Sequence, residues 1–181
     1  QDIIEMVKSK AQEKLSSNGV KEDSDKLALD IGVSAMKFGD LSNDVSRDYV
    51  FDLDNFMSFE GKTGPYLQYT AVRINSILGT NSFDVNNMDT SLFIKAHYFE
   101  LVRQIASFKQ TVEKAANEYS PNIIAKYLLA IAQSFNKFYA LEKINVSDEK
   151  VRNTNFALAY AVRTIINEGL ALLGIESVEK M

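Results

Sequence analysis

Two tyrosines and an arginine, Tyr66, Tyr69 and Arg73, form the most informative group of side chains in the sequence. On a helix, at about 100° per residue, they fall within roughly 60° of one another. They lie some 140° around the helix from an apolar stripe, which predicts that they are off the core face; the stripe comprises Leu67, Ala71, Ile74 and Leu78. Tyrosine rings stack on unpaired bases, and a guanidinium binds phosphate or a base edge. Tyrosines also line the boundaries of helical bundles with wet hydroxyls. The pattern therefore leaves open an RNA-binding face and a bundle boundary.

The triplet Gly61-Lys62-Thr63 resembles the end of a phosphate-binding loop. Such a loop also needs a glycine five positions earlier, because its backbone amides cradle the phosphates. Phe56 stands at that position, so we do not expect a nucleotide site here.

Carboxylates and the single histidine give no catalytic or metal-binding constellation. His97 has only Glu100 within helical reach, which predicts a surface or boundary residue. The chain has no cysteine, which excludes disulfides, thiolate zinc sites and cysteine nucleophiles. Hydrolysis by carboxylates needs two of them at a fixed separation in one cleft, and the sequence marks no such pair. We expect the clustered acids to cap helices and to solvate a loop instead. They are Asp40, Asp44, Asp48, Asp52 and Asp54.

The spacing of apolar residues predicts an all-α protein, a helical bundle preceded by a two-helix arm. Asn18-Gly19 should separate the first two helices, and Asp23 or Ser24 should cap the second. The segment 39–59 should be extended, with a short turn packed on apolar residues. Helices are expected at 2–16, 24–38, 65–78, 90–107, a shorter stretch ending at Tyr119, about 121–138, and 148–173.

Residues that typically begin or end helices support these boundaries. Pro65 suits a first helical position after Thr63-Gly64, Ser120-Pro121 should cap the next-to-last helix, and Gly174 suits a left-handed terminator. In the helix after Pro121, apolar residues step by 4, 3, 4 and 3, which is typical of a bundle seam. Its members are Ile124, Leu128, Ile131, Phe135 and Phe138.

Composition describes a folded chain of 181 residues with 46% hydrophobic and 24% charged residues. No apolar run approaches the roughly 18 residues of a membrane span, so we expect no membrane partner, and the lack of cysteine favours the cytoplasm. Residues 1–60 hold 7 Lys and Arg against 13 Asp and Glu, or −6, whereas residues 61–181 hold 13 against 11, or +2. A polyanion should therefore meet residues 61–181.

Several runs of the sequence are similar to arginyl-tRNA synthetases, at the junction between the catalytic core and the C-terminal anticodon-binding domain. The longest runs from Phe51-Asp52-Leu53-Asp54 and Met57-Ser58-Phe59 to Tyr66-Leu67-Gln68-Tyr69. Further runs are Ile31-Gly32-Val33, Ala35-Met36-Lys37-Phe38, Asp40-Leu41-Ser42, Ala132-Gln133-Ser134-Phe135-Asn136-Lys137-Phe138-Tyr139, Gly169-Leu170, Leu172-Leu173-Gly174-Ile175 and Lys180-Met181.

The resemblance implies a class I synthetase fragment. Residues 1–60 would be the connector from the catalytic domain and 61–181 the helical anticodon module, which binds arginine tRNA. Neither a His-x-Gly-His element nor a Lys-Met-Ser-Lys type loop occurs in the sequence. The missing N-terminal catalytic domain would therefore use ATP, with magnesium, and this fragment would bind no cofactor. We expect the fragment to be a monomer. The start at Gln1 also suggests an excised piece.

By the same resemblance, the anticodon contacts map onto Tyr66, Tyr69, Arg73, Tyr139 and Met181. Thr70-Ala71-Val72 departs from relatives that place a histidine near the arginine. Independently, Ile175 and Val178 should hold the last residues against the bundle, so that Met181 is ordered and returns toward the helix of Tyr139.

Two other functions stay open: a helical module that binds protein rather than RNA, and an enzyme active within this fragment. Salt separates the first from an RNA-binding domain, because RNA binding weakens steeply as salt rises and apolar protein contacts do not.

Overall fold

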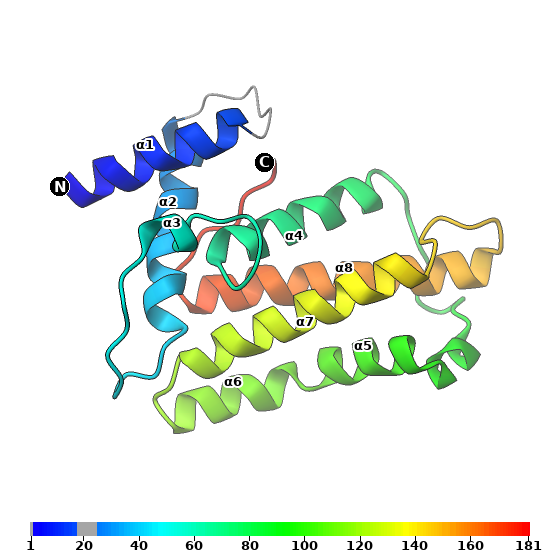
Figure 1. The fold of residues 1–181 in the computed structure, drawn as a ribbon. Coiled ribbons are helices and arrows are strands. Elements are labelled where there is room, and N and C mark those ends of the chain that lie inside the picture. The colour runs from blue at the N-terminus through cyan, green and yellow to red at the C-terminus, as the bar shows by residue number, and fades with distance from the viewer. Residues whose placement is uncertain (1, 18–24) are drawn as a thin grey trace.

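The protein is built from helices (Figure 1). A computed structural model describes residues 2–17 and 25–181, and within these ranges it contains no strand, which confirms the all-α prediction. The expected break at Asn18-Gly19 and the caps Asp23 and Ser24 lie outside the described residues. The elements are α1 (Asp2–Ser17), α2 (Asp25–Leu41), α3 (Leu53–Phe56), α4 (Gly64–Leu78), the 3-10 helix η1 (Thr90–Ile94), α5 (Ala96–Ala106), α6 (Phe108–Asn117), α7 (Asn122–Leu141) and α8 (Glu149–Leu172).

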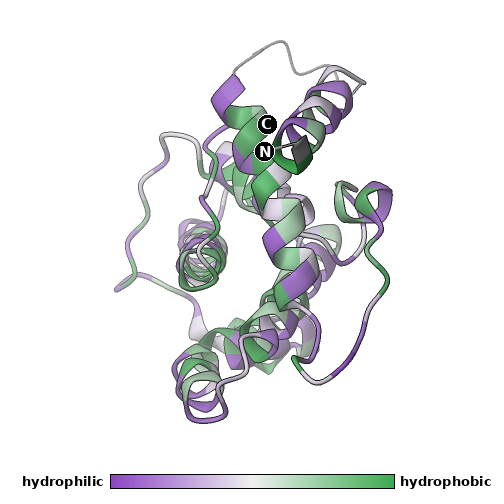
Figure 2. Ribbon diagram, turned by 90° about the vertical axis from the view of Figure 1, so that its left-hand side faces the viewer, coloured by the Kyte–Doolittle hydropathy of each residue, from purple (hydrophilic) through white to green (hydrophobic). Residues whose placement is uncertain are grey.

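Helix α7 lies at the centre of the bundle, in contact with α4, α5, α6 and α8. Its predicted seam is confirmed, because Leu128, Ile131, Phe135 and Phe138 are completely buried. Figure 2 shows hydrophobic and hydrophilic residues on the same helices, as expected where each helix buries one face only. This core holds α4, the helix with the two tyrosines and the arginine, against α7 and α8.

The start of α4 is fixed by its cap and by a close approach to α2. The Thr63 hydroxyl accepts a hydrogen bond from the amide of Tyr66, and Pro65 follows in the first turn, where it costs no backbone bond. A β-carbon added to Gly64 would lie 2.6 Å from the carbonyl oxygen of Ser34 on α2. Only glycine therefore allows the two helices to pack this closely.

The first two helices and α3 share a second, smaller core that we call the arm cluster. It comprises Ala11, Leu15, Ala28, Ile31, Ala35 and Met57. Helix α2 also sends Phe38 into the core of the bundle, so it contacts both cores. The division of the chain at residues 60 and 61 stays a prediction.

The connector before α4 departs in part from its predicted extended form. Residues 53–56 form the short helix α3, which begins where Asp52 accepts a hydrogen bond from the amide of Asn55. Phe56 and Phe59 pack on the arm cluster, as expected for a segment lying on apolar residues. Val50 remains exposed.

The helix predicted at 90–107 is wrong at its start. Asp89 accepts a hydrogen bond from the amide of Ser91 and begins the 3-10 helix η1, which ends before α5. The change from 3.0 to 3.6 residues per turn breaks the apolar stripe, and Ile94 is left 89% exposed. Ser120 does not cap α7 with its side chain, whereas Gly174 has the predicted left-handed conformation, with φ of 67°.

A separate result concerns membranes. Among the described residues, no helix combines the length and the apolar character needed to cross a bilayer.

Replacing Gly64 with alanine tests the close approach of α2 and α4. The new methyl group would overlap the Ser34 backbone, so the free energy of unfolding should fall by about 1–3 kcal/mol in urea denaturation. Ser76→Ala, at an exposed position of the same helix, should stay within about 0.5 kcal/mol of the wild type. Equal stability of Gly64→Ala and the wild type would show that the two helices are not closely packed here.

Candidate nucleic-acid interface

The outer side of α4 carries the three predicted side chains. Tyr69 is 45% exposed and Arg73 is exposed, whereas Tyr66 is half-buried against the bundle core. The opposite side of the helix buries Leu67 and Ile74 completely. The prediction that the two tyrosines and the arginine lie off the core stripe is confirmed for Tyr69 and Arg73, while Tyr66 lies at the boundary.

The hydroxyl of Tyr66 is held by α7. Asn136 donates a hydrogen bond to it from Nδ2, at 2.7 Å, and this fixes the direction of the ring edge. Asn136 was not among the predicted site residues, although it precedes Tyr139 by three positions and therefore shares a side of its helix. That spacing was the available signal in the sequence.

Tyr139 on α7 and Arg73 on α4 are in direct contact. The guanidinium carbon of Arg73 lies over the Tyr139 ring, 4.5 Å from its centroid, in a cation–π contact. Phe135 stacks beside the same ring, at 6.1 Å between centroids and 25° between planes. Within the described part of the chain Arg73 makes no ion pair, so its N–H groups stay available to an anionic or base-edge acceptor.

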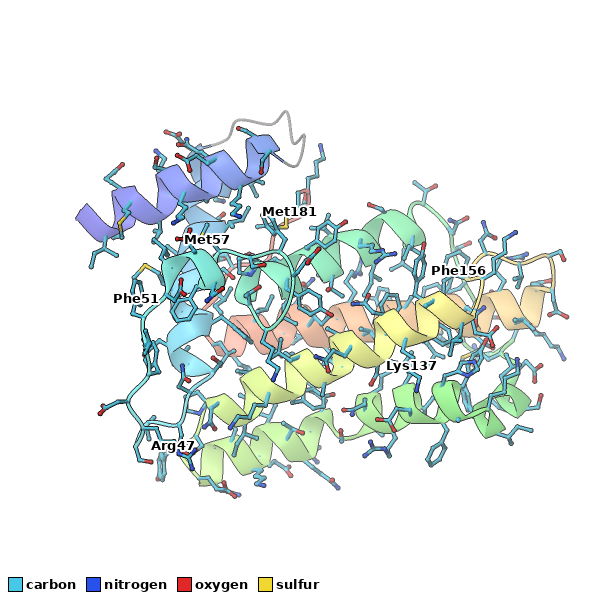
Figure 3. All side chains as sticks on the ribbon, viewed as in Figure 1. Arg47, Phe51, Met57, Lys137, Phe156 and Met181 are labelled. Atoms are coloured by element: carbon cyan, nitrogen blue, oxygen red, sulfur yellow. The ribbon has the colours of Figure 1, made fainter. Side chains whose placement is uncertain are left out.

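Met181 does not lie near the helix of Tyr139, where the sequence predicts it. It packs, half-buried, against the arm cluster rather than against the bundle core on which Tyr139 packs (Figure 3 shows it near Met57). The physical reason is that Phe59 and Met181 both pack on the arm cluster, where burial removes the apolar methionine side chain from water. The burial of Ile175 and Val178 was predicted correctly.

The phosphate-loop-like triplet and the acidic residues make hydrogen bonds and ion pairs that support the fold. Thr63 of the phosphate-loop-like triplet is the α4 cap and donates its own proton to the Ser58 carbonyl, so the triplet does not fit a nucleotide phosphate. Asp52 caps α3, Asp54 pairs with Lys10, and Asp44 accepts bonds from the Ser46 hydroxyl and amide, which lower its pKa. These three carboxylates cap a helix, pair with a lysine and hold a loop, respectively.

His97 is a boundary residue, as expected, but its partner is different. Its Nε2 lies 2.7 Å from Oε1 of Glu142, not beside Glu100. Burial acts to raise the pKa of Glu142, but hydrogen bonds with His97 and Lys95 outweigh it and leave this pKa below its ordinary value. No group of three or more His, Asp or Glu side chains suited to a metal ion occurs among residues 2–17 and 25–181.

Comparison with known proteins gives one family for most of the chain. Residues 67–181 match the family model described as the DALR anticodon binding domain. The chain is 38% identical over 183 aligned positions to an arginine–tRNA ligase of Halothermothrix orenii, and 41% identical over 160 positions to one of Streptococcus uberis. These alignments cover 100% and 88% of this chain but only 32% and 28% of the relatives.

Solved structures agree with this family. The arginyl-tRNA synthetase of Thermus thermophilus superposes with a TM-score of 0.91 at 25% identity, over 99% of this chain and 32% of that one. The arginyl-tRNA synthetase of Plasmodium falciparum gives a TM-score of 0.83 at 22% identity over the same shares, which shows the fold alone. The chain thus spans about a third of the length of the relatives it matches.

The contact between Arg73 and Tyr139 can be measured without any ligand. A double-mutant cycle with Arg73→Met and Tyr139→Leu should give a coupling free energy of about 0.5–1 kcal/mol in denaturant unfolding, because one contact links the two side chains. The cycle of Arg103→Met with Tyr139→Leu is the control, since Arg103 pairs with Glu100 instead. Strict additivity of Arg73→Met and Tyr139→Leu would contradict the contact.

Proposed function

The chain belongs to the family of DALR anticodon binding domains, and on that premise we propose that it recognises the anticodon loop of an arginine tRNA. The similarity to arginine–tRNA ligases over the whole chain supports the choice of tRNA. A protein-binding helical module, which the sequence left open, is not favoured by these matches.

One observation carries this proposal: a half-exposed tyrosine lies beside a guanidinium that no carboxylate of the described residues neutralises. Tyr69 offers a ring face to an unpaired base, and anticodon loops present such bases. Arg73, held over Tyr139, keeps free donors for a phosphate or a base edge. Stacking and a charge-assisted hydrogen bond can therefore act on neighbouring nucleotides.

The other residues act as supports or as further contacts. Asn136 holds the Tyr66 hydroxyl, so the edge of that ring is oriented before RNA arrives. Tyr139 supports the guanidinium, and Met181 supplies a flexible apolar side chain to the same loop, as the resemblance to the synthetases implies. Residues 61–181 carry a net charge of +2, against −6 for residues 1–60, so the bundle is the part of the chain that favours the RNA phosphates.

We propose that the reaction itself belongs to a longer protein, since this chain spans about a third of the length of its relatives. In that protein, an N-terminal catalytic domain would use ATP with magnesium to attach arginine to the tRNA, in the cytoplasm and as a monomer. Residues 1–60 would connect that domain to the anticodon module formed by residues 61–181. Within this chain the site residues serve binding alone.

Replacing Tyr69 with alanine should weaken binding of an arginine-tRNA anticodon stem-loop roughly five- to hundredfold, because one stacked base is lost. Binding can be followed by fluorescence anisotropy at fixed salt. Tyr160→Ala is a matched control, since Tyr160 is also 45% exposed but lies on α8, where the Arg163 guanidinium is 4.8 Å from its ring centroid. This variant should bind as the wild type does.

Unequal stability must be excluded as the cause of any loss. Tyr66→Ala and Arg73→Ala should also weaken binding, and the Arg73 and Tyr69 variants should melt close to the wild type. Leu128→Ala, by contrast, should lose about 2–5 kcal/mol of stability, because it empties a completely buried site. Equal binding by Tyr69→Ala, Tyr160→Ala and the wild type would reject the proposed face.

The purified chain should not catalyse arginine-dependent exchange between ATP and pyrophosphate. Both signature elements are absent from its sequence, and its phosphate-loop-like triplet is a helix cap. A radiochemical exchange assay with a complete arginine–tRNA ligase as the positive control gives the measurement. Exchange above background by the chain alone would place catalytic residues here and contradict the assignment.

A further inference from the structure

The segment after α8 is held along its length instead of ending freely. Gly174 takes a positive φ of 67°, and the amide of Ile175 then donates to the Leu170 carbonyl at 2.9 Å. Ile175 is 3% exposed and belongs to the bundle core. Residues 174–181, which we call the C-terminal segment, therefore start from a fixed point.

Two side chains from different parts of the chain bind the backbone at the start of this segment. The Lys37 ammonium of α2 donates to the carbonyl of Gly174, and Nε2 of Gln68 on α4 donates to the carbonyl of Glu176 at 2.7 Å. In Figure 1 the red segment accordingly leaves α8 and rises past α2 and α4. Val178, 8% exposed, and Met181 follow, the latter on the arm cluster.

Gln68 is unusual because it is completely buried while its Oε1 has no hydrogen-bond partner. A buried oxygen without a hydrogen-bond partner destabilises a fold, so an amide side chain is unfavourable at a core position. Its described interaction is the bond to Glu176, 108 residues away. Its burial, and the roughly 100° between neighbouring residues of a helix, also keep it from the surface that Tyr69 presents.

We propose that Gln68 is a positioning residue for RNA binding: by holding Glu176 it fixes the path of the C-terminal segment and so the place of Met181. Gln68 does not contact RNA. This inference rests on the proposed function and on the assignment of Met181 as an anticodon contact. It links that methionine to a residue one position before the stacking tyrosine.

The variant Gln68→Met separates positioning from fold stability. Methionine has nearly the same shape, and the change removes the unpaired oxygen together with the donor, so the free energy of unfolding should change little. Thr70→Val is the matched control, because Thr70 is also buried on α4 but its hydroxyl donates to Tyr66 within the same helix.

Release of the C-terminal segment is measured first, on the full 181-residue chain without RNA. Carboxypeptidase should remove Met181 and Lys180 several-fold faster from Gln68→Met than from the wild type or Thr70→Val, because exposed mobile ends are cleaved preferentially. Equal rates for all three proteins would overturn the proposal.

RNA binding is measured second, with the anticodon stem-loop of an arginine tRNA. Deleting Lys180 and Met181 should weaken binding of the wild type several-fold, Gln68→Met should weaken it similarly, and the deletion should add little in the Gln68→Met background. Full additivity, or no effect of the deletion in the wild type, would overturn the positioning role. Loss of the Tyr69→Ala effect would instead reject the proposed function, so the two failures are distinguishable.

A second variant covers the case in which Gln68→Met does not fold. Lys37→Met removes the other donor to the segment from an exposed position on α2, where a loss of fold is not expected. It should give the same faster cleavage and the same non-additivity with the deletion. Cleavage of Lys37→Met at the wild-type rate would contradict the proposal that Lys37 and Gln68 hold the C-terminal segment.

Discussion

Burial of one apolar stripe of α4 fixes the rotation of that helix, and the rest of the candidate site depends on this rotation. With Leu67 and Ile74 in the core, Tyr69 and Arg73 must face outward and Gln68 must face the C-terminal segment. The cap at Thr63 and the close approach at Gly64 fix where along its axis the helix starts. Exposed and buried polar residues of α4 thus have their directions set by the same hydrophobic contact.

Polar contacts then orient side chains that packing alone would leave mobile. Asn136 bonds the Tyr66 hydroxyl, and the ring of Tyr139 lies under the Arg73 guanidinium, so α7 orients two side chains of α4. Ordering side chains before binding reduces the entropy that the complex must lose. In the proposed complex, a single RNA loop would therefore bind a surface whose side chains are largely ordered beforehand. Tyr69 is the ring of this surface that is exposed for stacking.

Sequence patterns were sufficient where periodicity is long and regular. The seam from Ile124 to Phe138 and the exposure of Tyr69 and Arg73 follow from helical spacing, and Gly174 from its freedom at positive φ. Spacing could not reveal η1, because Asp89 selects a tighter helix by a local hydrogen bond and so exposes Ile94. Contacts between distant residues, such as Met181 on the arm cluster and Gln68 on Glu176, depend on tertiary packing and were missed or misplaced.

In the proposed function, the outer face of α4 and α7 distinguishes the anticodon loop of an arginine tRNA. This can be measured by titrating the 181-residue chain with an arginine tRNA and with a non-cognate tRNA, each at several salt concentrations. We expect tighter binding of the arginine tRNA at every salt concentration and a decline of both affinities as salt rises. Equal affinities for the two tRNAs at moderate salt would contradict it.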